Sequence, residues 1–472
     1  MEKRVDLGFA TVPSELAVER LPLHGQLPGW LSGTLLRNGP GTFRAGTQQV
    51  RHWFDGMAML HRFSFGDGQV GYANRFLATR AYTESRSTGR LEYAEFATDP
   101  PRTLVDRVTK KMTRAPSDNA KMGVARIGQK YVALSETAIQ IELDPQTLSA
   151  TARFAYEAPA DTGSVTTSHP LVDLAKDEVY NLVVRYDRVS HYRLYRIRGG
   201  GKPQLLGELP TPEPAYVHSF AMTETYLVLV ECPLVVKPVS LTQWMRPYIE
   251  NFRWKPQRGS AFHVLDRHTG QLVARFDSDA FFAFHQVNAF QAGDELRVDL
   301  VAYPDTDVIQ AYYLDQITSP QAEIPQGALR RYRLPLKRRN ERAGFEPLGD
   351  TGVELPRFDE RRFARTSYRH VYGVGHRPEQ LTGMYNQLVK VDTQRGQHVA
   401  WHAPGCYPGE PVFVDAPGGS AEDNGVVLSL VLDAAHGHSF LLVLDAQSFA
   451  ERARATLPHA AVHGFHGAFF PT

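Results

Sequence analysis

The sequence has few cysteines, no long apolar run and almost no net charge. Its 472 residues include only Cys232 and Cys406, which excludes a disulfide framework or a thiolate metal cluster and fits a reducing compartment. No stretch approaches the roughly 18 apolar residues of a membrane-spanning helix. The net charge of +1 gives no support for binding to nucleic acid. Because residues 1–6 lack the apolar segment of a secretory signal, we expect a cytoplasmic protein.

Short alternating strands make up most of the chain. Apolar residues account for 42% and charged residues for 22%, so the chain can bury a large core. Strands bounded by Gly, Asp, Asn or Pro are expected at 69–74, 130–135, 179–184, 226–230 and 426–432. Stretches 261–273 and 387–396 each read as an apolar run ending in Asp, a turn and a second strand, which is typical of propeller blades. We therefore expect one all-β domain over residues 1–472, although no strict repeat gives a blade count.

Two segments depart from the strand pattern. Segment 102–114 has apolar residues at helical spacing with basic residues around them, and segment 234–249 is apolar with Trp, Tyr and two basic residues. Both compositions are typical of elements that dip into a lipid headgroup layer. Each is equally typical of a helix that packs on the surface of its own domain. We expect the protein to associate peripherally with a membrane through these two segments.

Four histidines occur in apolar or strand-like contexts: His169, His218, His285 and His466. A histidine on an apolar strand is more often a core residue than a metal ligand, but four such positions without neighbouring charged residues favour a ligand role. The pattern alone leaves both interpretations open. Imidazole binds Fe(II), Zn(II), Cu and Ni well. We hypothesise that the four side chains meet at one metal ion, because the inner strands of a propeller converge on a single axis.

A metal site of this kind requires acceptors behind its ligands. A ligating imidazole usually donates its other N–H to a carboxylate. Glu136 follows the strand expected at 130–135, and Glu354 and Glu410 lie in apolar, strand-like surroundings. Each of these glutamates, taken singly, is more typical of an exposed turn than of a buried acceptor.

Seven motifs together resemble the carotenoid cleavage oxygenase family, over nearly the whole chain. The similarity is greatest to the branch that contains animal β-carotene oxygenases and the retinoid isomerohydrolase of the retinal pigment epithelium. The motifs are Gly33–Gly41, His52–His61, Tyr216–Phe220, Phe284–Ala289, Gly409–Val414, Glu422–Ser429 and Phe465–Gly467.

The resemblance implies a seven-bladed β-propeller, capped by loops and short helices, with one Fe(II) per chain on its axis. Matched motif by motif, the implied ligands are His169, His218, His285 and His466. The implied second-shell glutamates are Glu136, Glu354 and Glu410, which would anchor His218, His285 and His466 and leave His169 without a carboxylate.

Other positions follow from the same match. His463 is excluded as a ligand because the family's ligand is the histidine of Phe-His-Gly, and His52 and His61 are expected to be structural. Phe54 and Ser135 are implied to line an apolar substrate tunnel. Segments 102–114 and 234–249 match the membrane-facing patch of the family.

The implied reaction adds both oxygen atoms of O2 across a double bond of a carotenoid or apocarotenoid. It would give two carbonyl products, of retinal type if cleavage is central at 15,15'. One alternative is a dioxygenase that cleaves stilbenes or other phenylpropenes; bacterial members of that kind carry a lysine where this chain has Ser135. Further alternatives are a retinoid isomerohydrolase, a carotenoid-binding propeller without catalysis and a zinc hydrolase. The sequence leaves open the substrate, the bond that is cleaved and the oligomeric state.

Overall fold

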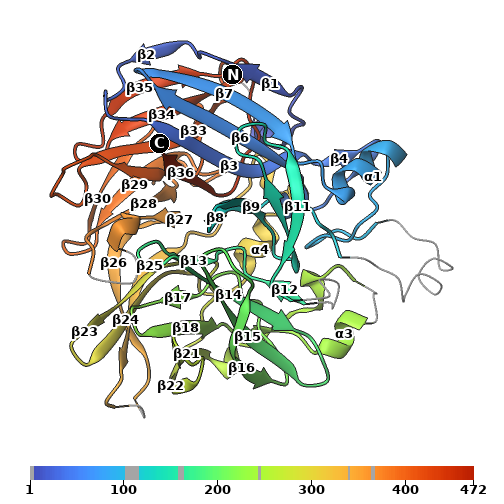
Figure 1. The fold of residues 1–472 in the computed structure, drawn as a ribbon, viewed down its shortest axis with the longest axis vertical. Coiled ribbons are helices and arrows are strands. Elements are labelled where there is room, and N and C mark those ends of the chain that lie inside the picture. Colours follow the sequence, from blue (N-terminus) through green and yellow to red (C-terminus); the bar gives the residue numbers. More distant parts are fainter. Residues whose placement is uncertain (1–4, 101–115, 158–163, 243–245, 339–340, 363–366) are drawn as a thin grey trace.

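The computed structural model describes residues 5–100, 116–157, 164–242, 246–338, 341–362 and 367–472. Seven antiparallel sheets of four to six strands lie around a common centre (Figure 1). The innermost strands of several neighbouring sheets contact one another around the central axis. The chain is therefore a seven-bladed β-propeller with few short helices, which confirms the predicted fold class.

The first four blades follow the chain in order. Blade 1 contains β8 (Gly123–Ile127), β9 (Lys130–Leu134), β10 (Ile139–Leu143) and β11 (Ala150–Ala155). Blade 2 contains β12 (Val165–Thr166), β13 (Leu171–Asp173), β14 (Glu178–Arg185), β15 (Ser190–Arg198) and β16 (Gln204–Thr211). Blade 3 contains β17 (Ala221–Met222), β18 (Tyr226–Glu231), β21 (Ser260–Asp266) and β22 (Leu272–Ser278). Blade 4 contains β23 (Gln286–Ala292), β24 (Glu295–Ala302), β25 (Ala328–Pro335) and β26 (Gly344–Gly352).

The last three blades bring the two ends of the chain together. Blade 5 contains β27 (Glu354–Arg357), β28 (His370–Gly375), β29 (Gln387–Asp392) and β30 (Gln397–Trp401). Blade 6 contains β31 (Cys406–Pro408), β32 (Val412–Asp415), β33 (Gly425–Asp433), β34 (His438–Asp445), β35 (Glu451–Thr456) and β2 (Leu23–Gly25). Blade 7 contains β36 (Gly467–Pro471), β3 (Gly33–Thr42), β6 (Met57–Gly66), β7 (Gln69–Phe76) and β1 (Leu16–Val18).

Pairing of the C-terminal β36 with the N-terminal β3 closes the ring, with Leu36 opposite Ala468. The N-terminal strand β2 also pairs with β35 of blade 6. The last residues of the chain thus form an inner strand of the ring. This strand begins at Gly467, so that His463 and His466 lie in the segment before it.

The outer hairpins show why the blades turn where they do. Asp144, Asp266, Asp392 and Asp445 each end an apolar strand or directly follow it, and each accepts backbone N–H groups two and three residues further on. This local side-chain cap favours a tight turn over continuation of the strand. The aspartate seen in the two predicted strand pairs is therefore a feature of four blades.

The short helices lie in connections within and between the blades. The connection from β7 to β8 carries α1 (Arg80–Thr88), and that from β18 to β21 carries β19 (Leu234–Val235), α3 (Pro238–Thr242), η4 (Ile249–Asn251), β20 (Arg253–Trp254) and η5 (Pro256–Arg258). The connection from β24 to β25 carries α4 (Asp307–Ala311) and α5 (Leu314–Ile317). The remaining elements are η1 (Val5–Phe9), β4 (Arg44–Ala45), β5 (Gln48–Gln49), η2 (Trp53–Asp55) and η6 (Glu360–Arg362).

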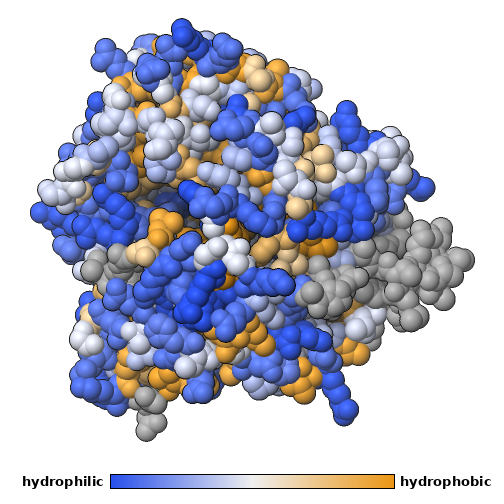
Figure 2. Space-filling view, in the orientation of Figure 1, coloured by the Kyte–Doolittle hydropathy of each residue, from blue (hydrophilic) through white to orange (hydrophobic). Residues whose placement is uncertain are grey.

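The structure describes only one of the two segments expected at a membrane. Segment 102–114 lies outside the described residues. In segment 234–249, Leu234 to Val236 are buried, because β19 pairs with β20, so this part of the interfacial prediction is wrong. The next residues form α3, which buries none of its side chains, and Val239 is 60% exposed. Apolar side chains are visible among hydrophilic ones in the region where Figure 1 places α3 (Figure 2). None of the helices in the described ranges has the length and apolar character needed to cross a bilayer.

Candidate metal centre

The four predicted histidines come from four blades. Each lies close to an innermost strand of its blade, near the propeller axis. His169 lies between β12 and β13, His218 precedes β17, His285 directly precedes β23 and His466 directly precedes β36. One nitrogen of each ring lies within 4.8 Å of the corresponding nitrogen of every other ring. Residues up to 297 positions apart thus converge, because the propeller brings the starts of its inner strands together.

The Nε2 atoms are the converging atoms. Nε2 of His169 lies 3.1 Å from Nε2 of His218, and Nε2 of His285 lies 3.3 Å from Nε2 of His466. Nitrogen ligands about 2.0–2.1 Å from one metal ion have separations of this size. The separations of the four nitrogen atoms therefore suit coordination of a single transition-metal ion.

Three carboxylates orient three of the rings. Nδ1 of His218 donates to Oε1 of Glu136 at 2.5 Å, and Nδ1 of His466 donates to Oε1 of Glu410 at 2.8 Å. Nδ1 of His285 donates to Oε1 of Glu354.

With its proton on Nδ1, a neutral imidazole directs the Nε2 lone pair at the common centre, which is the form that binds a metal. Burial lowers the pKa of His169, His218 and His466, so these rings are held neutral. For His169 and His466 the neighbouring imidazoles add to this effect, because a second positive charge nearby would be repelled. The residues therefore fit a divalent metal by geometry and by protonation state.

Every blade contributes one residue to the assembly. Going round the axis from blade 1 to blade 7, these are Glu136, His169, His218, His285, Glu354, Glu410 and His466. The structure brings all seven predicted residues together, and each of the three glutamates bonds one of His218, His285 and His466. Among the described residues, His169 forms no ion pair with a carboxylate.

Two of the carboxylates also accept a tyrosine hydroxyl. The hydroxyl of Tyr216 donates to Oε1 of Glu136 at 2.7 Å, and that of Tyr303 donates to Oε2 of Glu354 at 2.7 Å. Tyr216 lies two residues before His218, and period-2 alternation of an extended segment places both on the same side. That spacing was a signal in the sequence. Tyr303 offered no local signal, because it lies 51 residues from its partner.

Glu410 lies in a more strongly charged environment. Its carboxylate is 3.7 Å from Nη1 of Arg37 and 3.4 Å from Nη1 of Arg357, and its side chain is 1% exposed. Its Oε2 accepts the backbone N–H of Gly467 at 2.8 Å. A Cβ at position 467 would approach the carbonyl oxygen of Leu36 to 2.6 Å, which explains the glycine of the Phe-His-Gly motif. The sequence reasoning assigned no role to the two arginines.

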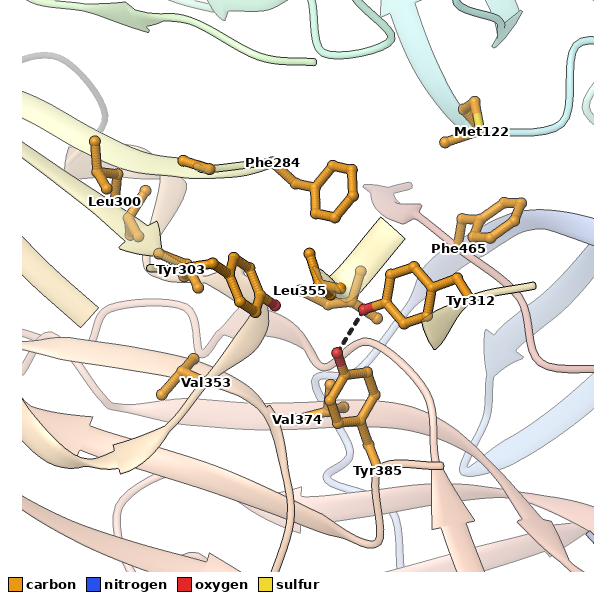
Figure 3. Packing of buried hydrophobic residues seen from close by; sticks show 14 of the residues in the cluster. Met122, Phe284, Leu300, Tyr303, Tyr312, Val353, Leu355, Val374, Tyr385 and Phe465 are labelled. Carbon is orange, nitrogen blue, oxygen red and sulfur yellow. Dashed lines mark hydrogen bonds between the residues drawn. The ribbon is translucent and has the colours of Figure 1, made fainter. Parts of the chain in front are cut away.

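Aromatic side chains surround the imidazole cluster. The ring of Phe54 stacks at 6.4 Å on that of His218 and meets Phe284 and Phe465 edge-on at 5.7 and 5.5 Å. Figure 3 shows Phe284 and Tyr312 facing each other, with the Tyr312 hydroxyl hydrogen-bonded to that of Tyr385. Phe54 thus lies beside the metal centre, and its part in a tunnel wall stays a prediction.

The other predicted residues lie outside the cluster. The hydroxyl of Ser135 lies 3.1 Å from that of Thr137 and accepts the Thr137 N–H, so it serves the turn before Glu136. Nδ1 of His52 accepts the N–H of Phe54, and His61 bonds Tyr72. The ring of His463 lies against Phe9 instead of the metal centre, which agrees with its exclusion as a ligand. All three of these histidines act as structural residues.

Comparisons with known proteins extend these findings. Residues 9–471 match the family model described as retinal pigment epithelial membrane protein. The chain belongs to the carotenoid cleavage oxygenase family. Within this family it is 34% identical to a carotenoid isomerooxygenase of Galleria mellonella, over 95% of this chain and 92% of the relative. It is 31% identical to the mitochondrial carotenoid-cleaving dioxygenase of Homo sapiens, over 95% and 87% of the two chains.

Solved structures of the family share the fold. A mutant of the Synechocystis apocarotenoid oxygenase superposes with a TM-score of 0.89 at 24% identity and covers 99% of this chain and 98% of that one. A chimera of that oxygenase with the retinal pigment epithelial protein gives a TM-score of 0.87 at 23% identity, with the same coverage. The family and the enzyme class predicted from the sequence motifs are therefore confirmed.

Proposed function

We propose that the protein is an Fe(II) dioxygenase that cleaves a double bond of a carotenoid or apocarotenoid with O2, giving two carbonyl products. The observation that carries this proposal is the cluster of four imidazoles, three of them fixed by carboxylates, in a chain of the carotenoid cleavage oxygenase family. Bound iron would supply the one-electron chemistry that lets O2 react with a carbon–carbon double bond.

The protein's own residues would hold the metal and shape the space around it. Four neutral imidazoles leave the charge of a divalent ion uncompensated at the ion itself. The negative charges lie one shell further out, on Glu136, Glu354 and Glu410. The rings of Phe54 and Phe284 present apolar faces beside the imidazoles, and such a surface suits a polyene better than a polar substrate.

Several relatives support a carotenoid substrate. One is named as a β,β-carotene 15,15'-dioxygenase of Homo sapiens and is 29% identical over 95% of this chain and 92% of its own length. Central cleavage to retinal-type products is therefore our preferred reaction within the proposal. Ser135 stands where stilbene-cleaving relatives are expected to carry a lysine, and its hydroxyl is engaged in a local turn, which makes a phenol contact there less favourable.

We also propose that the enzyme works in the cytoplasm at a membrane surface, from which it takes a lipid-dissolved substrate. The support is α3, whose Val239 is 60% exposed and lines a surface pocket. Val239→Asp should lower the fraction of protein that floats with phospholipid vesicles. Leu174→Asp, at another exposed apolar residue, should leave that fraction unchanged. Equal flotation of all three proteins would contradict the membrane proposal.

The test of the main proposal is anaerobic reconstitution with Fe(II), followed by incubation under O2 with β-carotene, an apocarotenal or resveratrol in detergent. Chromatography and mass spectrometry identify the products. We expect two carbonyl fragments from one of the polyenes and none from His285→Ala. Cleavage of resveratrol alone would move the protein to the stilbene-cleaving group. Iron-loaded protein that cleaves none of these compounds would overturn the proposal.

A further inference from the structure

A pocket of about 730 Å³ opens beside α3, away from the metal-ligating histidines. Its apolar wall is formed by Ala94, Val165, Pro238, Val239 and Leu241. The wall also contains two tyrosines, Tyr186 and Tyr248. The remaining lining residues are polar or charged: Asp99, Asp187, Arg188, Thr242, Arg246 and Asn251. A pocket that combines apolar surface with placed polar groups is typical of a site that orients a ligand by a polar end.

The two tyrosine hydroxyls form a pair. Their oxygen atoms lie 2.6 Å apart, and neither hydroxyl has another hydrogen-bond partner among the described residues. Two phenols that bond each other use only one of their two O–H protons. Within the described part of the chain no group accepts the second proton, so it can be donated to a ligand. Burial raises the pKa of both tyrosines, and the charge of Glu136 adds to the shift, so both remain protonated donors at physiological pH.

A continuous line of aromatic rings joins this pair to the imidazole cluster. Tyr248 contacts Phe96 at a ring separation of 6.4 Å, Phe96 contacts Phe54 at 5.4 Å, and Phe54 contacts His218 at 6.4 Å. Phe96 also meets Tyr216, which bonds the carboxylate of Glu136. A chain of ring contacts therefore links the tyrosine pair to the imidazole of His218.

We propose that Tyr186 and Tyr248 bind an oxygen atom at one end of the polyene, so that the enzyme prefers aldehyde-, ketone- or hydroxyl-bearing apocarotenoids to hydrocarbon carotenes. This inference rests on the proposed function and adds the substrate class. A carbonyl or hydroxyl oxygen accepts the second phenol proton, whereas a hydrocarbon end cannot accept it. The expected preference is about five- to tenfold, the size of one neutral hydrogen bond.

The experiment compares two polyenes of equal chain length, one ending in an aldehyde and one ending in a methyl group. Equilibrium binding to the iron-free protein is followed by the shift of polyene absorbance, and kcat/KM is measured with the Fe(II) protein. The variants are Tyr186→Phe, Tyr248→Phe and the double variant. Tyr385→Phe is the matched control, because it breaks another buried pair of hydroxyls that are 2.6 Å apart and does not line this pocket.

We expect wild type to favour the aldehyde by about five- to tenfold in both measurements. The double variant should lose this preference through weaker use of the aldehyde, while Tyr385→Phe should keep the ratio. An unchanged ratio in the double variant, or failure of the iron-free wild type to bind either polyene, would overturn the inference. Binding with the expected preference, but without cleavage by the iron-loaded protein, would instead overturn the proposed oxygenase function and leave the ligand class standing.

Discussion

Replacement of Glu136 or Glu410 by glutamine should separate metal binding from folding stability. Both carboxylates accept the Nδ1 proton of a ligating imidazole, but their surroundings differ. Glu410 lies between Arg37 and Arg357 with its side chain 1% exposed. Glu136 is 18% exposed, and the tyrosine hydroxyl that it accepts carries no charge. We therefore expect similar losses of metal affinity and different losses of stability.

The magnitudes follow from the contacts. Either glutamine keeps a carbonyl for the imidazole but no negative charge, which should weaken metal binding about 10–100-fold, or about 1.4–2.7 kcal/mol. Glu410→Gln also leaves the buried guanidinium of Arg37 and the partly exposed one of Arg357 without their shared anion. Arg37 retains two backbone carbonyls and Arg357 retains Glu360, so the cost lies at the lower end of the about 3–5 kcal/mol that removal of one partner of a buried ion pair costs. We expect about 3 kcal/mol for Glu410→Gln and about 1 kcal/mol for Glu136→Gln.

Metal affinity is measured by titration of the apoprotein with Co(II) against a competing chelator, and the free energy of unfolding by denaturant titration of the same apoprotein. Metal affinity within twofold of wild type in either variant would refute the role of that carboxylate. Equal destabilisation of the two apoproteins would refute the role assigned to the arginines.

Three other changes test separate parts of the structure. His285→Ala should abolish metal retention on gel filtration, whereas the exposed His402→Ala should retain the metal; retention by both would remove His285 from the site. Tyr303→Phe removes a donor to the carboxylate behind His285 and should weaken Co(II) binding about two- to tenfold, and an unchanged titration would contradict this. Hydrogen bonds from Arg369 lower the pKa of Asp392 to about 2, so its stabilising effect is present above the unfolded pKa near 4 and is lost as pH falls through about 2. Asp392→Asn should therefore lower the free energy of unfolding at pH 7 and make it fall less steeply as the pH is lowered. If denaturant titrations at several pH values gave the same pH dependence for the variant and the wild type, this role of Asp392 would be refuted.

The sequence predicted most of the fold because the blade pattern is local. An apolar strand that ends in Asp, followed by a turn, is readable within about a dozen residues, and the hairpins at Asp266 and Asp392 formed as expected. Closure of the ring was only partly readable. Pairing of β3 with β36 joins residues more than 400 positions apart, and no local propensity encodes such a contact. The family resemblance supplied the blade count that the residues themselves did not.

The candidate metal centre was also predictable from the sequence only in part. The resemblance identified the four histidines and three glutamates, and the structure supplies the geometry that joins them. Tyr303 and Arg357 were missed because each reaches its carboxylate from a different blade or connection. Burial of Leu234 to Val236 was missed because an apolar run reads alike in a core strand and in a membrane contact.

The central claim is that the iron-loaded protein adds O2 across one polyene double bond. The most direct test is a single incubation of the Fe(II) protein with an apocarotenal under ¹⁸O2, with immediate reduction of the products to alcohols to prevent exchange with water, followed by mass spectrometry. For a dioxygenase we expect both fragments to gain one ¹⁸O at the new end and one O2 to be consumed for each polyene cleaved. Label in only one fragment, or cleavage that proceeds without O2, would contradict it.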